Sequence, residues 1–177
     1  MIFPTRYVRH ITELCPTELR ASQIDGLLID LDGTLKDYGV PEFPESTLEW
    51  VKRVRSAGIV ICLFSNGVID KVAAAAQVLE TPFVAKAYKP SPLRVGAGLA
   101  ALGLPANRVA LVGDQLFADV LAGRLYGIRT VLVEPTSWVE PWFTRLKRPV
   151  EMPFRYRMRR VYQKALLSAA VSRPGNQ

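Results

Sequence analysis

The chain has 177 residues, of which 49% are hydrophobic and 22% charged, and its net charge is +7. This length suits one domain with a substantial core, and the composition excludes a disordered chain. No wholly apolar run is long enough to span a bilayer, and Arg6 and Arg9 are not followed by the apolar stretch of a secretory signal. The two cysteines have neither a metal-site spacing nor a disulfide pattern. We therefore expect a cytoplasmic protein.

The first 23 residues are predicted to form an N-terminal lead. The stretch from Pro16 to Leu19 is typical of a short helix, because proline is well tolerated in the first helical turn. The apolar residues of the lead are expected to cover the edge of a sheet or to contact a membrane surface, and the sequence does not decide between these two roles.

Strand-like and helix-like segments alternate after the lead. An apolar run from Ile24 to Leu31 is typical of a strand that is covered on both faces. Further strands are predicted at residues 59–64, 83–88, 109–112 and 130–133. Helices are predicted at residues 46–57, with Ser46 as N-cap and Glu49 completing a capping box, and at residues 68–79, 91–102, with Ser91 as N-cap, and 116–126. This alternation predicts an α/β fold with a doubly wound parallel sheet.

Polar clusters stand where these apolar runs end. They are Asp30-Leu31-Asp32-Gly33-Thr34, Ser65-Asn66-Gly67, Lys89-Pro90, and Gly113-Asp114 with Asp119 five residues further on. A single Asp-Gly or Ser-Asn-Gly is most often an ordinary turn, and a single lysine is most often a surface residue. Because the carboxyl ends of parallel strands form the ligand crevice of an open sheet, the ordered set predicts one shared site.

This ordered set resembles the four motifs of the haloacid dehalogenase (HAD) superfamily of phosphotransferases, over residues 24–134. The resemblance implies a catalytic domain at residues 24–137, between the lead at 1–23 and a basic, aromatic extension at 138–177. The stretches between the first, second and third motifs are too short for the cap domain that many members carry, so the site is expected to be open to large or surface-bound substrates. Gly33 stands where many members have Asn.

The resemblance implies that Asp30 attacks phosphorus and forms an aspartyl phosphate, which divides one difficult step into two. Asp32 is expected to protonate the leaving alkoxide and then to activate water. Thr34 is expected to bind substrate or to fix the Asp32 carboxylate, and a turn hydroxyl that serves only the backbone is an equal alternative on the sequence alone.

The phosphoryl group is expected to lie against the second and third motifs. Ser65 and the backbone amides of Asn66 and Gly67 suit its oxygens, because they precede a predicted helix. Lys89 is expected to supply the positive charge that stabilises the same oxygens, and the Lys-Pro pair favours Lys89 over the nearby Lys86.

The expected cofactor is Mg²⁺, a hard cation that prefers oxygen ligands. The resemblance assigns it to Asp30, to the backbone carbonyl of Asp32 and to Asp114. Asp119 is expected to support the site, by orienting it or the Lys89 side chain, and not to bind the cation directly; a charge in the first turn of a helix is the alternative role.

The positive charge is concentrated in the tail. Residues 145–177 hold nine Lys or Arg and one acid, a charge of +8, which leaves −1 for residues 1–144 of the total of +7. Trp138, Trp142 and Phe143 precede this run, and apolar residues follow at helical spacing, namely Met158, Val161, Tyr162, Ala165, Leu166 and Ala169. A basic amphipathic helix with aromatic neighbours is typical of a membrane-surface element that binds anionic lipid. A helix packed on the domain is an equal alternative, and nucleic acid is less favoured because no known nucleic-acid module is visible.

The motifs resemble most closely a capless branch, subfamily IIIA, that includes phosphatidylglycerophosphate phosphatases. This resemblance implies a Mg²⁺-dependent phosphomonoesterase of phospholipid biosynthesis that works at the inner face of the membrane. A soluble phosphatase of sugar or nucleotide phosphates is the enzymatic alternative. A factor that associates with ribosomes or nucleic acid through its tail is the non-enzymatic alternative.

Overall fold

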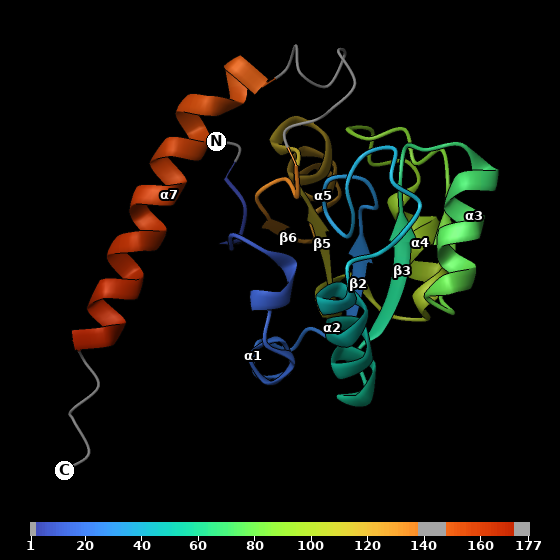
Figure 1. The fold of residues 1–177 in the computed structure, drawn as a ribbon, viewed down its shortest axis with the longest axis horizontal. Coiled ribbons are helices and arrows are strands. Elements are labelled where there is room, and N and C mark those ends of the chain that lie inside the picture. Colours follow the sequence, from blue (N-terminus) through green and yellow to red (C-terminus); the bar gives the residue numbers. More distant parts are fainter. Residues whose placement is uncertain (1–2, 138–147, 172–177) are drawn as a thin grey trace. The chain divides into compact units, whose positions relative to one another are not determined.

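The computed structural model describes residues 3–137 and 148–171, and residues 3–137 form one mixed α/β unit (Figure 1). Its sheet has six strands, all parallel, in the order β1-β6-β5-β2-β3-β4. The strands are β1 (Arg6–Tyr7), β2 (Gly26–Ile29), β3 (Val60–Phe64), β4 (Phe83–Val84), β5 (Val109–Gly113) and β6 (Arg129–Leu132). The predicted doubly wound parallel sheet is therefore confirmed.

Helices cover both faces of this sheet. They are α1 (Pro16–Ala21), α2 (Glu45–Ser56), α3 (Ile69–Val78), α4 (Val95–Leu102) and α5 (Leu121–Tyr126), with short turns η1 (Ile11–Glu13), η2 (Ala106–Arg108) and η3 (Leu116–Val120). Successive side chains of β2 point to opposite faces. Leu27 and Ile29 pack in one buried cluster with residues of α1, α2 and α3, whereas Leu28 packs in a second cluster with residues of α4 and α5. The central strand is buried on both faces, as its apolar sequence predicts.

The N-terminal lead belongs to the sheet. β1 pairs in parallel with β6, and Tyr7 lies opposite Leu132. Val8, Ile11 and Leu14 behind it are buried in the core cluster of the α1–α3 face. Of the two roles that the sequence left open for these apolar residues, the structure shows the one at the sheet edge, and it adds a strand that the sequence pattern did not reveal because only two residues pair.

Two helices begin at residues other than those predicted. α2 begins at Glu45 after Pro44, so Ser46 is not its N-cap, and the Pro44 carbonyl accepts the first hydrogen bonds of the helix, from Thr47 and Leu48. α4 begins only at Val95, so the prediction of Ser91 as its N-cap is wrong. The Ser91 hydroxyl accepts a hydrogen bond from the Leu93 amide, in a turn that precedes the helix. In both places local turn geometry outweighs the capping pattern.

The third predicted strand is shorter than residues 83–88. Only Phe83–Val84 pairs with β3, and the chain then bends across the end of that strand. The Lys86 amide donates to the Gly67 carbonyl and the Ala87 amide to the Ser65 carbonyl. These bonds bring the segment before Lys89 against the loop that follows β3.

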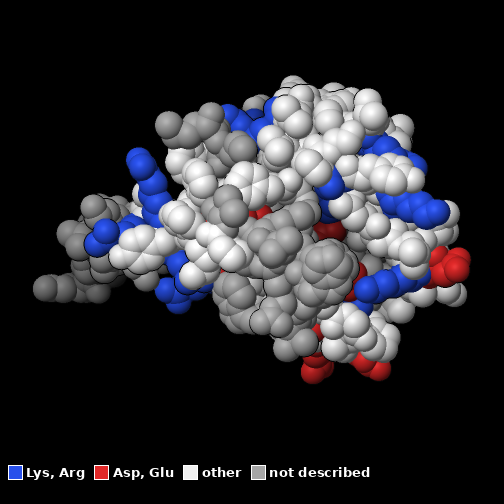
Figure 2. Space-filling view, turned by 90° about the horizontal axis from the view of Figure 1, so that it is seen from above, with Lys and Arg blue, Asp and Glu red and all other residues white. Residues whose placement is uncertain are grey.

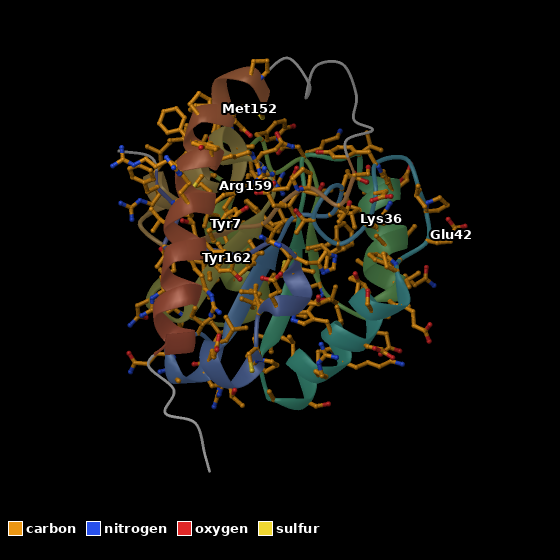
Figure 3. The ribbon with its side chains drawn as sticks, turned by 60° about the vertical axis from the view of Figure 1, so that its left-hand side comes forward. Tyr7, Lys36, Glu42, Met152, Arg159 and Tyr162 are labelled. Atoms are coloured by element: carbon orange, nitrogen blue, oxygen red, sulfur yellow. The ribbon has the colours of Figure 1, made fainter. Side chains whose placement is uncertain are left out.

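The chain divides into two compact units, residues 1–140 and residues 141–177. The described part of the second unit is one helix, α7 (Arg148–Val171), along which Met152, Arg159 and Tyr162 project (Figure 3). The Glu151 carboxylate accepts from Arg155 one turn later, at 3.4 Å. A helix is therefore confirmed for the basic segment. Trp138, Trp142 and Phe143 lie outside the described residues, as do the side chains of Ala165, Leu166 and Ala169.

Among the described residues, no helix is both long enough and apolar enough to cross a membrane.

Candidate active site

Three adjacent strands bring the predicted acidic residues to one edge of the sheet. Asp30 and Asp32 follow β2, Asp114 follows β5, and Ser65 follows β3. β5, β2 and β3 are neighbours and parallel, so their carboxyl ends meet (Figure 1). All four side chains are buried. Viewed from above the molecule as it stands in Figure 1, acidic atoms are recessed among basic and uncharged side chains (Figure 2).

Lys89 connects the elements of this site. Its Nζ lies 2.6 Å from Asp30 Oδ1, 2.6 Å from Asp119 Oδ1 and 2.8 Å from the Phe64 carbonyl oxygen. These three bonds use the three donors of an ammonium group. Because the lysine and both carboxylates are buried, each charge depends on the others for compensation. The structure thus brings together Asp30, Lys89 and Asp119, with Asp119 in the supporting position predicted for it.

The ionisation of this cluster is shifted by burial and charge. Burial raises the pKa of Asp30, the charge of Lys89 lowers it, and the nearby carboxylates of Asp119 and Asp32 raise it, so that it reaches about 6 instead of 3.8. Burial alone would lower the pKa of Lys89, but Asp119 and Asp30 hold it above its ordinary value through their charges and hydrogen bonds. The lysine is therefore a fixed cation, and the acid next to it is the group whose charge can change.

A wide helical turn places Asp119. The predicted helix at residues 116–126 begins with the π-helical turn η3 and continues as α5. In this turn the Asp119 carboxylate folds back over the chain, and its Oδ2 accepts from the Gln115 amide at 3.0 Å. A Cβ atom on Gly113 would lie 2.1 Å from Asp119 Cγ, which no structure tolerates. Gly113 is thus required so that Asp119 can lie against β5 and reach Lys89.

The loop after β3 contacts the backbone of Lys89. The Asn66 side chain accepts from the Lys89 amide at 2.7 Å and donates to the Lys89 carbonyl at 3.0 Å, so it fixes the backbone of that lysine. The Gly67 amide donates to Ser65 Oγ at 3.2 Å. Phosphate binding through the Asn66 backbone stays a prediction, whereas the structure shows that the Asn66 side chain holds Lys89.

Thr34 lies one turn beyond the two aspartates. Its hydroxyl is buried, and among the described residues it has no hydrogen-bond partner. A buried hydroxyl without a partner costs free energy, and buried polar groups are nearly always hydrogen-bonded. This position is consistent with the predicted role of Thr34 in binding substrate or fixing a carboxylate.

Asp32 is held by two lysines that the motif analysis did not identify. Lys71 Nζ in α3 lies 2.7 Å from Asp32 Oδ2, and Lys36 Nζ lies 3.4 Å from Asp32 Oδ1. Lys36 also donates to the carbonyl of Val40, which closes the loop after β2 onto itself. Glu42, farther along this loop, points away from the sheet (Figure 3).

One signal in the sequence could have revealed Lys71. It stands in the first turn of α3, where a cation is unfavourable because the helix dipole is positive there. A basic residue at such a position suggests a nearby anion. Lys36 is four residues after Asp32, but no regular element links the two, so its position depends on the fold of the loop.

The site also meets the requirements of a cation. Asp30, Asp114 and Asp119 each offer a carboxylate oxygen, and these oxygens lie within 4.8 Å of one another. An oxygen-only set of ligands suits a hard divalent cation. Both carboxylate oxygens of Asp119 are engaged, by Lys89 and by the Gln115 amide, whereas one oxygen of Asp30 binds Lys89. Asp30 and Asp114 are therefore the better candidates for cation ligands. Gln115 donates from Nε2 to the Tyr38 hydroxyl at 2.9 Å, beside this group.

The buried carboxylates and lysine at the ends of parallel strands are the arrangement that the four motifs predict for a phosphotransferase of the HAD type. In agreement, residues 87–135 match the family model described as HAD-hydrolase-like. The chain is 30% identical over 148 residues to the "Probable phosphatase YqeG" of Bacillus subtilis (strain 168), a match that covers 84% of this chain and 86% of that protein. The chain belongs to the HAD-like phosphatase family and is a phosphoric monoester hydrolase.

Solved structures agree on the fold. A protein of Listeria monocytogenes serotype 4b superimposes with a TM-score of 0.54 and 14% identity over 67% of this chain and 85% of that one. The cobalt-bound deoxy-D-mannose-octulosonate 8-phosphate phosphatase of Haemophilus influenzae superimposes with a TM-score of 0.52 and 16% identity, over 63% and 69%. At these identities the likeness concerns the fold alone.

Proposed function

We propose that this protein is a Mg²⁺-dependent phosphomonoesterase that removes the terminal phosphate of phosphatidylglycerophosphate at a membrane surface. The observation that carries the chemistry is the buried bridge of Lys89 between Asp30 and Asp119, beside Asp114. It supports this chemistry because a carboxylate that could attack phosphorus, a buried positive charge and candidate cation ligands lie together at one edge of the sheet.

In the proposed reaction, a carboxylate oxygen of Asp30 attacks phosphorus and Asp32 gives a proton to the leaving alkoxide. Asp32 then takes a proton from water, which attacks the aspartyl phosphate and releases inorganic phosphate. Lys89 and the amides that follow β3 stabilise the charge that develops on the phosphoryl oxygens. Mg²⁺, held by Asp30, Asp114 and the Asp32 carbonyl, would neutralise part of the negative charge of the phosphate.

The segments between the motifs support a substrate that is large or that lies in a membrane surface. Residues 34–90 are fully described, and between the motifs they hold only loops, α2 with β3, and α3 with β4. Neither interval contains a separate domain that would close over the site.

Apolar side chains next to the site loops give further support. Val68 follows the Ser65–Gly67 loop, Tyr88 precedes Lys89, and Leu93 follows shortly after; all three are exposed, Leu93 to 88%. Exposed apolar residues around an open site favour contact with a membrane or another apolar surface.

The basic tail favours an anionic surface. α7 carries its basic residues between Arg148 and Lys164, and Glu151 is the single acid of residues 145–177. Each cation near an anionic bilayer contributes about 1 kcal/mol of attraction. We therefore place the enzyme at the inner face of the membrane, with the tail binding lipid.

The test is phosphate release from phosphatidylglycerophosphate in mixed micelles with Mg²⁺, beside a panel of soluble sugar and nucleotide monophosphates. The Asp30→Asn variant serves as the blank. Strong preference for the lipid supports the proposal. Activity on soluble esters alone would keep the chemistry and overturn the membrane substrate, and inactivity on every ester would favour the tail-dependent binding factor instead.

A further inference from the structure

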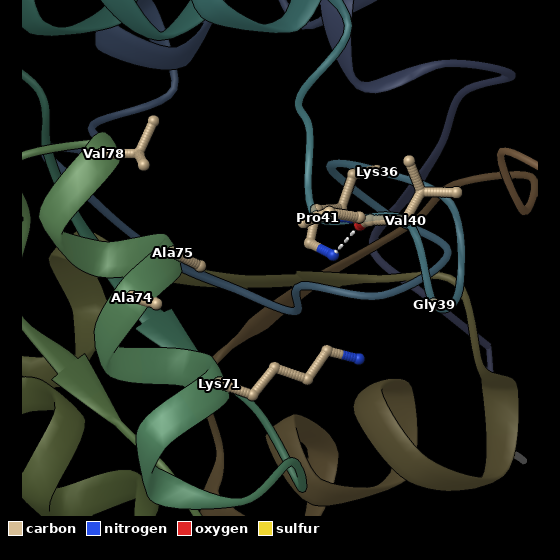
Figure 4. A pocket seen from close by; sticks show the side chains of 8 residues that line it. All are labelled: Lys36, Gly39, Val40, Pro41, Lys71, Ala74, Ala75 and Val78. Atoms are coloured by element: carbon tan, nitrogen blue, oxygen red, sulfur yellow. Dashed lines mark hydrogen bonds between the residues drawn. The ribbon is translucent and has the colours of Figure 1, made fainter.

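A pocket of about 450 Å³ adjoins the proposed proton donor, between the loop after β2 and helix α3 (Figure 4). It is lined by Lys36, Gly39, Val40, Pro41, Lys71, Ala74, Ala75 and Val78. Its volume lies within the range of about 300–1,000 Å³ that is usual for small-molecule sites. The motifs of the sequence did not reveal it, since its two walls come from segments about thirty residues apart.

The wall of this pocket has two chemical parts. Lys71 extends from α3, and Lys36 lies on the loop opposite it, where it donates to the Val40 carbonyl (Figure 4). Both lysines also bind Asp32, Lys36 at 3.4 Å and Lys71 at 2.7 Å. The remaining side chains are apolar and belong to Val40 and Pro41 on the loop and to alanines and Val78 on α3. A ligand that fits both parts carries an anionic group next to an apolar one.

The pocket is on the leaving-group side of the reaction. In the proposed reaction Asp32 gives its proton to the leaving oxygen, so the two lysines that bind Asp32 lie beside the leaving group. The phosphoryl group is expected to lie beside Lys89 instead, next to Asp30. Lys71 lines the pocket and is 39% exposed, so a second anionic group in the leaving group could reach its ammonium group.

We propose that this pocket binds the leaving group, and that it selects phosphate monoesters whose leaving group carries a second anionic group beside an apolar part. The inference rests on the phosphomonoesterase activity proposed above and names its substrate class. A phosphodiester with attached acyl chains has this chemistry, and so does a soluble acid with an apolar substituent.

Lys71 is the residue that recognises the second anion. Its side chain is 39% exposed, and Asp32 is its one described hydrogen-bond partner. An ammonium group has three donors, so two remain for a ligand. Lys36 is 3% exposed and also binds the Val40 carbonyl, so it positions the loop and Asp32 instead.

The test compares two soluble esters, glycerol 3-phosphate and deacylated phosphatidylglycerophosphate, whose leaving group contains a phosphodiester. The full chain is assayed with Mg²⁺, and the quantity compared is the ratio of kcat/KM for the second ester to that for the first. Lys71→Met is expected to lower this ratio about tenfold, the order of one charge-assisted hydrogen bond. Lys71→Arg is expected to retain most of it. Lys52→Met, an exposed lysine on α2, is the matched control and should leave the ratio unchanged.

A third ester, the dihexanoyl form of the same lipid, tests the apolar wall. Val78→Thr is expected to lower kcat/KM for this ester two- to threefold relative to the deacylated one, whereas Val60→Thr, on the first residue of β3, should not.

The outcomes separate the two proposals. An unchanged ratio in an active Lys71→Met variant would overturn the pocket assignment and leave the phosphatase assignment intact. Wild-type inactivity on all three esters would overturn both. A preference for the deacylated phosphodiester that the acyl chains do not increase would identify the second anion alone as the recognised group and would overturn the apolar part of the proposal.

Discussion

The two aspartates of the first motif lie two residues apart but in different surroundings. Asp30 is enclosed with Lys89 and Asp119, both fully buried, by bonds that join the ends of β2, β3 and β5. Asp32 binds two lysines that line a pocket, and one of them, Lys71, is 39% exposed. The positions of the Asp30 cluster are determined by the sheet, which suits chemistry that is common to many substrates. The surroundings of Asp32 are determined by a loop and a helix, which suits recognition of one substrate.

The largest effect is expected when the nucleophile is removed. Asp30→Asn keeps the size of the side chain and removes its ability to attack phosphorus, so kcat should fall by on the order of 10⁴-fold. The protein should remain folded, because a buried carboxylate without a bound cation costs stability. Phosphate release and circular dichroism check the two parts. An Asp30→Asn enzyme with near-normal kcat would remove the assignment of Asp30 as the nucleophile.

Loss of the buried cation is expected to rank second. Lys89→Met leaves Asp30 and Asp119 buried side by side without a positive charge, which should destabilise the fold by about 3–5 kcal/mol. In the folded fraction kcat should fall about 10²–10³-fold, as after loss of other charge-stabilising donors. Urea unfolding and single-turnover assays measure the two effects. The control is Lys86→Met, the neighbouring lysine that the Lys-Pro pattern did not favour; equal losses in both variants would contradict the role of Lys89.

The pKa of Asp30 predicts how the free energy of unfolding depends on pH when EDTA removes bound cations. Its pKa is 3.8 in the unfolded chain and about 6 in the fold, so between these values the folded protein binds more protons. The contribution of Asp30 to stability therefore falls as pH rises from about 4 to 6 and stays low above that. The free energy of unfolding of Asp30→Asn should thus rise relative to wild type by up to about 3 kcal/mol between pH 4 and 7.

Urea unfolding at each pH measures this difference. The exposed Asp70, changed to Asn, is the matched control and should differ from wild type by a nearly constant amount across the same range. A difference for Asp30→Asn that is also constant would show that burial does not control the ionisation of Asp30.

The same contrast explains what could be predicted from the sequence. The strand ends are marked by apolar runs that stop at Asp30, Ser65 and Asp114. Parallel pairing of the strands brings these three residues together, independently of the conformation of the loops. The sheet and the Asp30 cluster follow from that rule. The place of Lys71 in the first turn of α3 suggests a nearby anion, but only the packing of α3 near the loop that carries Lys36 determines that this anion is Asp32. The strand β1 was missed because only two residues pair, and the late start of α4 was missed because the turn at Ser91 outweighs the capping pattern.

A smaller effect is expected when the support of Lys89 is disturbed without removing any charge. In Gly113→Ala the new Cβ would collide with the Asp119 side chain, which must then move away from β5 and from Lys89. Lys89 keeps its bonds to Asp30 and to the Phe64 carbonyl, so kcat should fall only about tenfold, with little change in KM, as for loss of one charge-assisted hydrogen bond.

Gly96→Ala is the matched control for this change. Gly96 lies in α4, and a Cβ there would meet only the flexible end of Tyr126, at 3.3 Å. Its activity should therefore equal that of wild type. If Gly113→Ala also keeps full activity, Asp119 can move without affecting Lys89, and the bridge between the two would be structural only. A loss in Gly113→Ala that Asp119→Asn reproduces, and that the double variant does not increase, would establish that both changes act through the same contact with Lys89.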